Sequence, residues 1–119
     1  MSKVSAYHLL IKHEGSRNPV SRRTGQSTSG KSKDKAHEEL NKLLGQLNGL
    51  SGEALKEEFK KLAQAHSDCG SFRQGGDLGE FGKGDMQKQF EDGTYALSVG
   101  GLSGIVDSDS GSHLILRYA

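Results

Sequence analysis

Residues 4–11, Val-Ser-Ala-Tyr-His-Leu-Leu-Ile, combine aliphatic and aromatic side chains over the length of a β-strand and end at Lys12. This pattern predicts a first strand. Three further short stretches have the composition of strands: residues 78–81, 104–107 and 113–118. A polar turn at residues 108–111 joins the last two. The glycine-rich segment 67–84, which contains the first of the three, excludes a long helix because glycine weakens helix interiors.

Two amphipathic helices and a shorter third one are expected between these strands. The first begins at Ser32, with Asp34 in its first turn, ends at Asn48-Gly49 and buries an apolar stripe at helical spacing: Ala36, Leu40, Leu43, Leu44 and Leu47. The second is capped by Ser51, ends near His66 and buries Leu55, Phe59, Leu62 and Ala63. The third fits residues 86–97 with Asp85 as its cap. The resulting order predicts an α+β domain in which helices pack on a small antiparallel sheet.

The size and composition of the chain restrict its class. At roughly 100–200 residues per domain, the 119 residues form one domain, residues 1–119. No apolar run approaches the roughly 20 residues that a membrane helix needs, and residues 1–3 do not open a signal peptide. The only cysteine, Cys69, cannot form an internal disulfide. We therefore expect an intracellular protein with no membrane partner.

Positive charge is concentrated near the beginning of the chain. Residues 1–35 hold eight Lys or Arg side chains against Glu14 and Asp34, whereas the whole chain has a net charge of only +1. Most of this charge lies in or beside a polar loop, residues 14–32. The ordinary interpretation of such a cluster of charges is a loop exposed to solvent, and the functional interpretation is a site that binds an anionic partner. The loop lacks aromatic side chains on which bases stack, so no nucleic acid partner is expected.

Two motifs match known binding patterns without the context that those patterns need. Residues 25–32, Gly-Gln-Ser-Thr-Ser-Gly-Lys-Ser, fit the nucleotide-binding pattern G-x-x-x-x-G-K-[ST], but the preceding segment is polar instead of a buried strand. Residues 107–111 begin like a calcium loop, but the glycine comes one position early. We interpret the first as a consequence of composition and the second as a hairpin turn. A tetrahedral zinc site is not expected either, because the chain has a single cysteine.

Several residues have both a structural and a functional interpretation. Cys69 can be a nucleophile with a histidine as base, or an inert side chain, although its glycine-rich surroundings argue against simple core packing. His8 and His113 fall within the first and last predicted strands, where buried histidines are often structural. Apolar periodicity alone does not separate core from binding pocket for Leu78, Met86 and Phe90.

Taken together, five motifs in this order and spacing closely resemble the parvulin family of peptidyl-prolyl cis-trans isomerases, and most closely its Pin-type members. The motifs are His-Leu-Leu-Ile-Lys-His at 8–13, Ser-Asp-Cys at 67–69, Gly-Asp-Leu-Gly-Glu-Phe at 76–81, Gly-Asp-Met-Gln-Lys-Gln-Phe-Glu at 84–91 and Asp-Ser-Gly-Ser-His at 109–113. The resemblance covers nearly the whole chain and suggests a single-domain form without a WW domain. It implies the parvulin fold, an FKBP-like superfold with a four-stranded antiparallel sheet surrounded by about four helices.

The resemblance also assigns roles to residues of this chain. It implies a catalytic set of His8, Cys69, Ser110 and His113, and a proline pocket of Leu78, Met86, Gln87 and Phe90. Lys12 and Arg17 match two of three phosphate-binding residues. Asn18 stands where the third basic residue is usual, so Arg22 or Arg23 is expected to replace it. Gln89 replaces the usual proline before Phe90, and Ser112 replaces a residue that is often aliphatic before His113.

The expected function is therefore isomerisation of phosphoSer-Pro and phosphoThr-Pro bonds in phosphoproteins, without cofactor or metal. We expect a non-covalent mechanism that stabilises the twisted amide. The alternative is a phosphopeptide-binding module with little turnover, and nucleotide binding through residues 25–32 ranks third. A monomer is the expected state, located in the cytoplasm and the nucleus.

Overall fold

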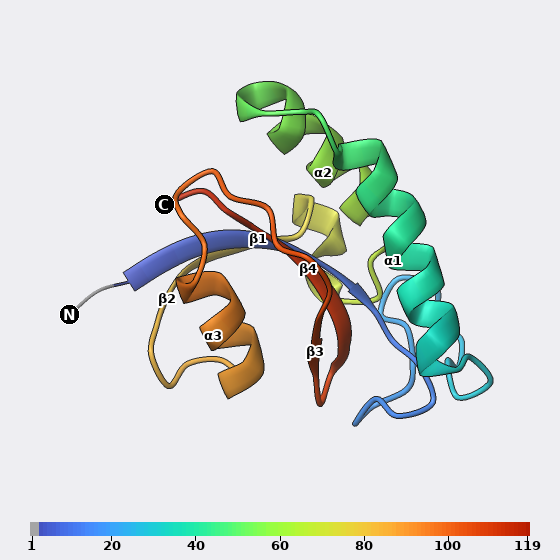
Figure 1. Cartoon of the computed structure of the whole chain (residues 1–119). Helices are drawn as coiled ribbons and strands as arrows, with labels where there is room; N and C mark the ends of the chain where they lie inside the picture. The colour runs from blue at the N-terminus through green and yellow to red at the C-terminus, as the bar shows by residue number, and fades with distance from the viewer. Residues whose placement is uncertain (1–2) are drawn as a thin grey trace.

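The computed structural model describes residues 3–119, which fold around one antiparallel sheet (Figure 1). Its four strands are β1 (Lys3–Ile11), β2 (Asp77–Gly82), β3 (Val106–Ser108) and β4 (Gly111–Arg117). They lie in the order β2-β1-β4-β3, so the first and last strands of the sequence form the centre of the sheet. The two central strands pair from Ala6 with Arg117 to Ile11 with Ser112. The α+β class and the four-stranded antiparallel sheet are confirmed.

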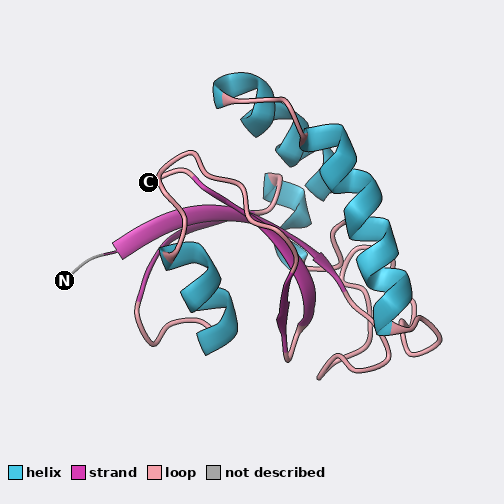
Figure 2. Cartoon of the chain, viewed as in Figure 1, coloured by secondary structure: helices cyan, strands magenta, loops and turns pink. Residues whose placement is uncertain are grey.

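Helices cover both faces of this sheet. α1 (Lys33–Leu47) and α2 (Gly52–His66) lie on one face, and α3 (Lys88–Tyr95) lies on the other, as Figures 1 and 2 show. A short 3-10 helix, η1 (Gly70–Gln74), leads from α2 into β2. The described residues thus contain the three helices that the residue pattern predicted, and η1 is a fourth, in agreement with the about four helices that the resemblance implied. The residue pattern did not predict η1.

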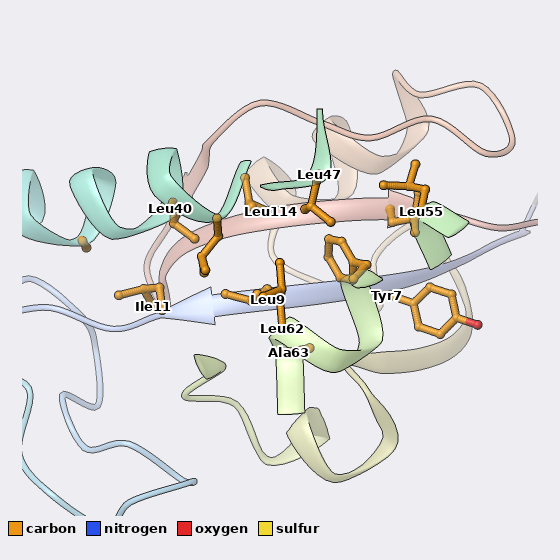
Figure 3. Close-up of a cluster of buried hydrophobic side chains, with 13 residues drawn as sticks. Tyr7, Leu9, Ile11, Leu40, Leu47, Leu55, Leu62, Ala63 and Leu114 are labelled. Carbon is orange, nitrogen blue, oxygen red and sulfur yellow. The ribbon is translucent and has the colours of Figure 1, made fainter. Parts of the chain in front are cut away.

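Alternation along the central strands divides the core into two clusters, because successive side chains of a strand point to opposite faces. On the α1 and α2 face, Tyr7, Leu9 and Ile11 of β1 pack against the helices (Figure 3). The stripes predicted for the two helices supply the other side of this core: Ala36, Leu40, Leu43, Leu47, Leu55, Phe59, Leu62 and Ala63. Only Leu44 is less buried than its spacing suggests.

The second cluster lies between the sheet and α3. Val4 and Ala6 of β1 and Ile115 of β4 pack there against Phe81 and Phe90. His8 follows Val4 and Ala6 at the same spacing, and His113 precedes Ile115 by two residues, so both histidines face the α3 side. The smaller helix leaves part of this face uncovered, which gives room for a site.

Several helix and strand ends differ from the sequence prediction. Ser32 caps α1 as predicted, with its hydroxyl accepting a hydrogen bond from the Lys35 amide at 3.1 Å, but Ser51 makes no such side-chain bond at α2. Asp85 does not cap α3, which begins after Gln87. The Asp85 carboxylate instead accepts a hydrogen bond from the Gly82 amide at 2.8 Å and closes the turn after β2.

The strand predicted at residues 104–107 begins later, at Val106. Just before it, Ser103 interrupts the regular ladder, because its hydroxyl accepts the hydrogen bond of the Ile115 amide at 2.9 Å. β3 is therefore only three residues long, and the polar turn predicted at 108–111 connects it to β4 as a hairpin. No helix in residues 3–119 has the length and apolar character that crossing a membrane requires.

The basic loop, residues 14–32, is tied to the body of the molecule at several points by its backbone. The Glu14 amide donates to the Lys31 carbonyl at 2.7 Å, which closes the base of the loop. Arg22 donates its amide to the Asp68 carbonyl at 2.9 Å. The loop is thereby placed beside the segment that follows α2.

Candidate active site

Two neighbouring cavities open on the α3 side of the sheet. The first, of about 530 Å³, is basic and is lined by Lys12, Arg17, Asn18 and Arg22 together with Gly70 and Ser71. The second, of about 180 Å³, is mainly apolar. Leu10, Cys69 and Ser110 line both cavities. These three residues therefore form the boundary between a basic and an apolar compartment.

Beneath the apolar cavity lies a hydrogen-bonded pair of histidines. The Nδ1 atoms of His8 and His113 are 3.1 Å apart, so one of them donates a proton and the other accepts it. The rings are stacked with centroids 5.3 Å apart. The Nε2 atom of His8 lies 3.2 Å from the Ser71 hydroxyl, and that of His113 lies 2.6 Å from the Ser108 hydroxyl. The pair is thus held at both ends by serines.

The central position of His113 determines its protonation. Burial, and then the nearby charge of His8, lower the pKa of His113 well below its ordinary value of 6.5, although Asp107 opposes this shift. His113 is therefore neutral at physiological pH. A neutral imidazole has one donor and one acceptor nitrogen, which fits its two hydrogen bonds.

Cys69 precedes η1 and lies within reach of the same network. Burial by itself raises the pKa of the thiol, but hydrogen bonding from His8, the charge of His8 and hydrogen bonding from Ser71 outweigh it and lower that pKa to about 6. A cysteine with this pKa is largely a thiolate at neutral pH. The lowered pKa thus favours a thiolate at the boundary between the two cavities.

The apolar cavity contains all four residues that the sequence predicted for a proline pocket. Leu78, Met86 and Gln87 line it together with Phe90. Phe90 is 4% exposed and meets both histidine rings edge-on, with centroid distances of 5.4 Å to His8 and 5.0 Å to His113. Aromatic contacts of this kind fix a ring in place. The Phe90 ring and the two histidine rings therefore pack together at the bottom of the cavity.

Ser110 stands at the rim, on the turn between β3 and β4. Its hydroxyl accepts a hydrogen bond from the Gln87 side-chain amide at 3.2 Å. Its backbone amide donates to the Ser108 hydroxyl, also at 3.2 Å. Ser110 thereby links the apolar cavity to the histidine network.

The basic cavity brings together Lys12, Arg17 and Arg22. Lys12 follows β1 and donates from Nζ to the Val20 carbonyl at 2.8 Å, which holds its ammonium group in place. Burial, and then the charge of Arg22, lower the pKa of Lys12 below its ordinary value of 10.5. Arg17 and Arg22 line the same cavity and are exposed to solvent. Cations held this close together favour an anion between them.

Arg23 does not join this group. Its side chain donates to the Ser67 carbonyl at 3.2 Å and lies 3.9 Å from the Asp68 carboxylate, beside a different cavity. Arg22 and Arg23 were the two candidates to replace the basic residue that is usual at position 18. The structure brings Arg22, and not Arg23, to the basic cavity. Asn18 also lines this cavity but carries no charge.

Sequence reasoning missed Ser71, Ser108 and Leu10 as lining or supporting residues. A single serine in a serine-rich and glycine-rich segment carries no local signal, and Leu10 matches an ordinary buried strand position. The pairing of β1 with β4, the β3–β4 hairpin and the fold of η1 bring these side chains to the histidines and Cys69.

The two motifs that were set aside have structures in keeping with that interpretation. Residues 25–32 form part of the basic loop and are preceded by a polar segment with an isolated bridge between Val20 and Ser27, not by a buried strand. Residues 107–111 lie in the β3–β4 hairpin. Within residues 3–119, no three histidine, cysteine or carboxylate side chains are grouped so as to hold a metal ion.

Comparison with known proteins gives a consistent result. The family model described as "Rotamase: PPIC-type PPIASE domain" matches residues 8–118. The chain is 49% identical over 117 residues to "Peptidyl-prolyl cis-trans isomerase Pin1" of Digitalis lanata, covering 97% of this chain and 95% of the relative. It is 45% identical over 119 residues to "Peptidyl-prolyl cis-trans isomerase NIMA-interacting 1" of Theileria annulata, covering 100% of this chain and 82% of the relative.

Solved structures agree with these sequence matches. The solution structure of TbPIN1 superposes with a TM-score of 0.83 at 49% identity and covers 100% of both chains. The likeness therefore extends over the sheet, the helices and the loops that line both cavities.

Proposed function

This chain belongs to the PPIC-type peptidyl-prolyl cis-trans isomerases, and we propose that it acts on proline bonds preceded by phosphoserine or phosphothreonine. One observation carries the proposal. A basic cavity and an apolar cavity share the boundary formed by Leu10, Cys69 and Ser110. A dipeptide with a phosphate on one residue and a proline ring on the next matches this order of compartments.

The apolar cavity suits the ring of proline. Leu78, Met86 and Phe90 offer it an apolar surface, and Gln87 marks the polar rim. Resonance keeps the prolyl amide planar, and rotation must cross a barrier of about 18–20 kcal/mol. Holding the ring still while the preceding carbonyl rotates places the twisted amide next to the boundary residues.

The basic cavity suits the phosphate. Lys12, Arg17 and Arg22 supply the positive charge that a dianionic phosphate requires. Burial, and then repulsion from Arg22, lower the pKa of Lys12 in the free protein, and a bound anion relieves the repulsion. Binding energy from a group that does not react can then fix the substrate across the rotation.

Cys69 acts without forming a covalent bond in this proposal. The twisted amide has lost its resonance, so its carbonyl carbon carries less electron density from nitrogen and its nitrogen regains a lone pair. A thiolate near the carbonyl disfavours the planar, charge-separated form of the amide and favours the twisted one. The paired histidines and the serines at their ends hold this thiolate in place.

The test is a proline-isomerisation assay on phosphoSer-Pro, Glu-Pro and Ala-Pro peptides of otherwise equal sequence. We expect a strong preference for the phosphopeptide, and a loss of that preference in Arg17→Ala and Arg22→Ala. The matched control is Arg73→Ala, because Arg73 is an exposed arginine that lines neither cavity.

Equal rates on all three peptides in the wild-type protein would contradict the proposed phosphate selectivity. A preference that survives both arginine substitutions would contradict the assignment of the basic cavity. The monomeric state and the location in cytoplasm and nucleus stay predictions, which sedimentation and cell fractionation check.

A further inference from the structure

A polar cluster lies between α1 and the β3–β4 hairpin, outside the site described above. Its centre is the carboxylate of Asp107 on β3. One oxygen accepts hydrogen bonds from the Ser112 hydroxyl at 2.6 Å and from His37 Nε2 at 2.8 Å. The other oxygen lies 3.6 Å from the ammonium group of Lys33. Two residues of α1 thus bind one carboxylate of the edge strand.

The cluster lies on the face of the sheet opposite to the catalytic histidines. Asp107 pairs directly with Ser112, and both point toward α1, whereas the next residues, Ser108 and His113, point to the site. Adjacent residues of a strand share one rigid peptide unit. A displacement of Asp107 therefore displaces Ser108 as well.

The tip of this hairpin contacts each part of the candidate site. Ser108 bonds to His113 Nε2 at 2.6 Å, and Ser110 accepts from Gln87 at the rim of the apolar cavity. The Asp109 carbonyl accepts from the Arg17 amide at 2.7 Å. The histidine network, the apolar cavity and the basic cavity are thus each connected to this one turn by a hydrogen bond.

Within the sheet, this turn is attached through a short edge strand. β3 is three residues long and is an edge strand that pairs only with β4. On the α3 face, Val106 packs with the second core cluster, but Asp107 is the residue that reaches the opposite layer. Burial raises the pKa of Asp107, but bonds from Ser112 and His37 and the charges of His37 and Lys33 lower it below 3.8. Asp107 is therefore an ionised acceptor at neutral pH.

We propose that His37 is a positioning residue for the isomerase, which acts through its hydrogen bond to Asp107 and sets the position of the β3–β4 turn in the site. The role of the turn rests on the proposed function of the two cavities. His37 touches no part of either cavity. Ser112, at a position that is often aliphatic in the family, belongs to the same hydrogen-bonded cluster, because its hydroxyl donates the second hydrogen bond to Asp107.

The experiment compares His37→Ala, His37→Gln and Lys35→Ala in the full chain. Lys35 is the matched control, because it lies on the same helix and its side chain forms an exposed ion pair with Glu38. The Lys35→Ala substitution leaves the backbone amide that Ser32 accepts from unchanged. The rates are measured on the Ala-Pro peptide as well as on the phosphopeptide. The ring-nitrogen chemical shifts of His113 are recorded by NMR, and thermal melting confirms that each variant is folded.

We expect His37→Ala to lower kcat on both peptides by about fivefold to tenfold, because small displacements of positioning groups have large effects on rate. The His113 signal shifts in this variant and not in Lys35→Ala. The glutamine of His37→Gln can donate to the same carboxylate, so it restores kcat to within about twofold of the wild type.

A folded His37→Ala variant with unchanged kcat and an unchanged His113 signal would overturn the proposal, and so would a loss that glutamine does not restore. If His37→Ala does not fold, Asp107→Asn replaces it and must also lower kcat and shift the His113 signal. The Ala-Pro peptide keeps this test separate from phosphate selectivity. A wild-type protein without phosphate preference overturns the proposed function. The role of His37 is tested separately, by the ratio of kcat in the variant to kcat in the wild type on the Ala-Pro peptide.

Discussion

The thiol of Cys69 shows how one residue takes its properties from its neighbours. Its pKa falls to about 6 only because His8 and Ser71 lie close enough to outweigh burial. The neighbouring His113 stays neutral because it is buried beside His8. The candidate site thus combines a thiolate with a neutral imidazole, and this combination can be tested directly.

Titration of Cys69 is expected to show thiolate absorbance at 240 nm with a midpoint near pH 6. In His8→Asn the midpoint should move upward, toward the ordinary value of 9.0, because the largest favourable interaction is lost. The folded-state pKa lies below the unfolded value, so ionisation of Cys69 stabilises the fold fully above pH 9. This contribution is lost as the pH falls through 6. A midpoint near 9 in the wild-type protein would rule out the interaction with His8.

Replacement of Cys69 distinguishes an electrostatic from a covalent role. Cys69→Asp keeps a negative group between the cavities, so it should retain far more isomerase activity than Cys69→Ala, by about tenfold in kcat/KM. The measurement is the isomerisation rate on the preferred peptide, with the melting temperature as a control for folding. Equal losses in the two variants would count against the non-covalent mechanism.

At the scale of single elements, β2 depends on a glycine beside the central strand. Gly76 has a φ of +85° and its carbonyl accepts the His8 amide at 2.8 Å. A Cβ at this position would collide with the His8 carbonyl oxygen. The approach of this turn to β1 therefore requires a residue without a side chain, and the position of His8 depends on it.

Gly76→Ala is expected to destabilise the fold by about 2–4 kcal/mol, because a strained φ and a steric clash act together. Gly79→Ala is the matched control. Gly79 also has a positive φ, of +70°, but a Cβ there would meet nothing within 4 Å. Urea unfolding should therefore show a smaller loss in the control, and equal losses would mean that the clash with β1 does not matter.

The prediction of elements from the sequence succeeded where a residue's own neighbours decide its structure. The stripes of α1 and α2 were predicted almost completely, because a helix satisfies its hydrogen bonds locally and its buried face follows from a period of 3.6 residues. The start of β3 was predicted too early, because the Ser103 hydroxyl takes the hydrogen bond of the Ile115 amide on β4. That contact joins segments that are distant in the sequence, so the local pattern did not reveal it. The start of α3 was misplaced because Asp85 is used in the turn after β2.

For the molecule as a whole, the sheet separates a core that gives stability from a face that carries the site. Phe59 of α2 is fully buried in the cluster on the α1 and α2 face of the sheet. Neither cavity of the candidate site includes a residue of α1 or α2. Stability and catalysis should therefore respond separately to substitutions on the two faces.

Phe59→Ala is expected to lower the free energy of unfolding by about 3–5 kcal/mol, as for other large buried aromatic side chains. Such a loss is a large part of the roughly 5–15 kcal/mol by which domains are stable. Below its melting temperature, the folded variant should keep a kcat/KM within about twofold of the wild type. Phe72→Ala, at a half-buried position on η1, is the control and should cost less. A strong loss of kcat/KM in folded Phe59→Ala would show that the two faces are coupled.

Local pattern was sufficient for the α+β class, the two long helices, the central strand and, through the resemblance of five motifs, the residues gathered around the apolar cavity. The class, the helices and the strand follow from spacing along the chain, whereas the residues of the cavity were implied by the resemblance to a family. Three features depended on contacts between distant segments: the choice of Arg22 over Arg23 at the basic cavity, the low pKa of Cys69, and the bond between His37 and Asp107. Each depends on an interaction energy that varies with distance in space, and residues 70 positions apart in the sequence come within 2.8 Å only when the sheet has formed.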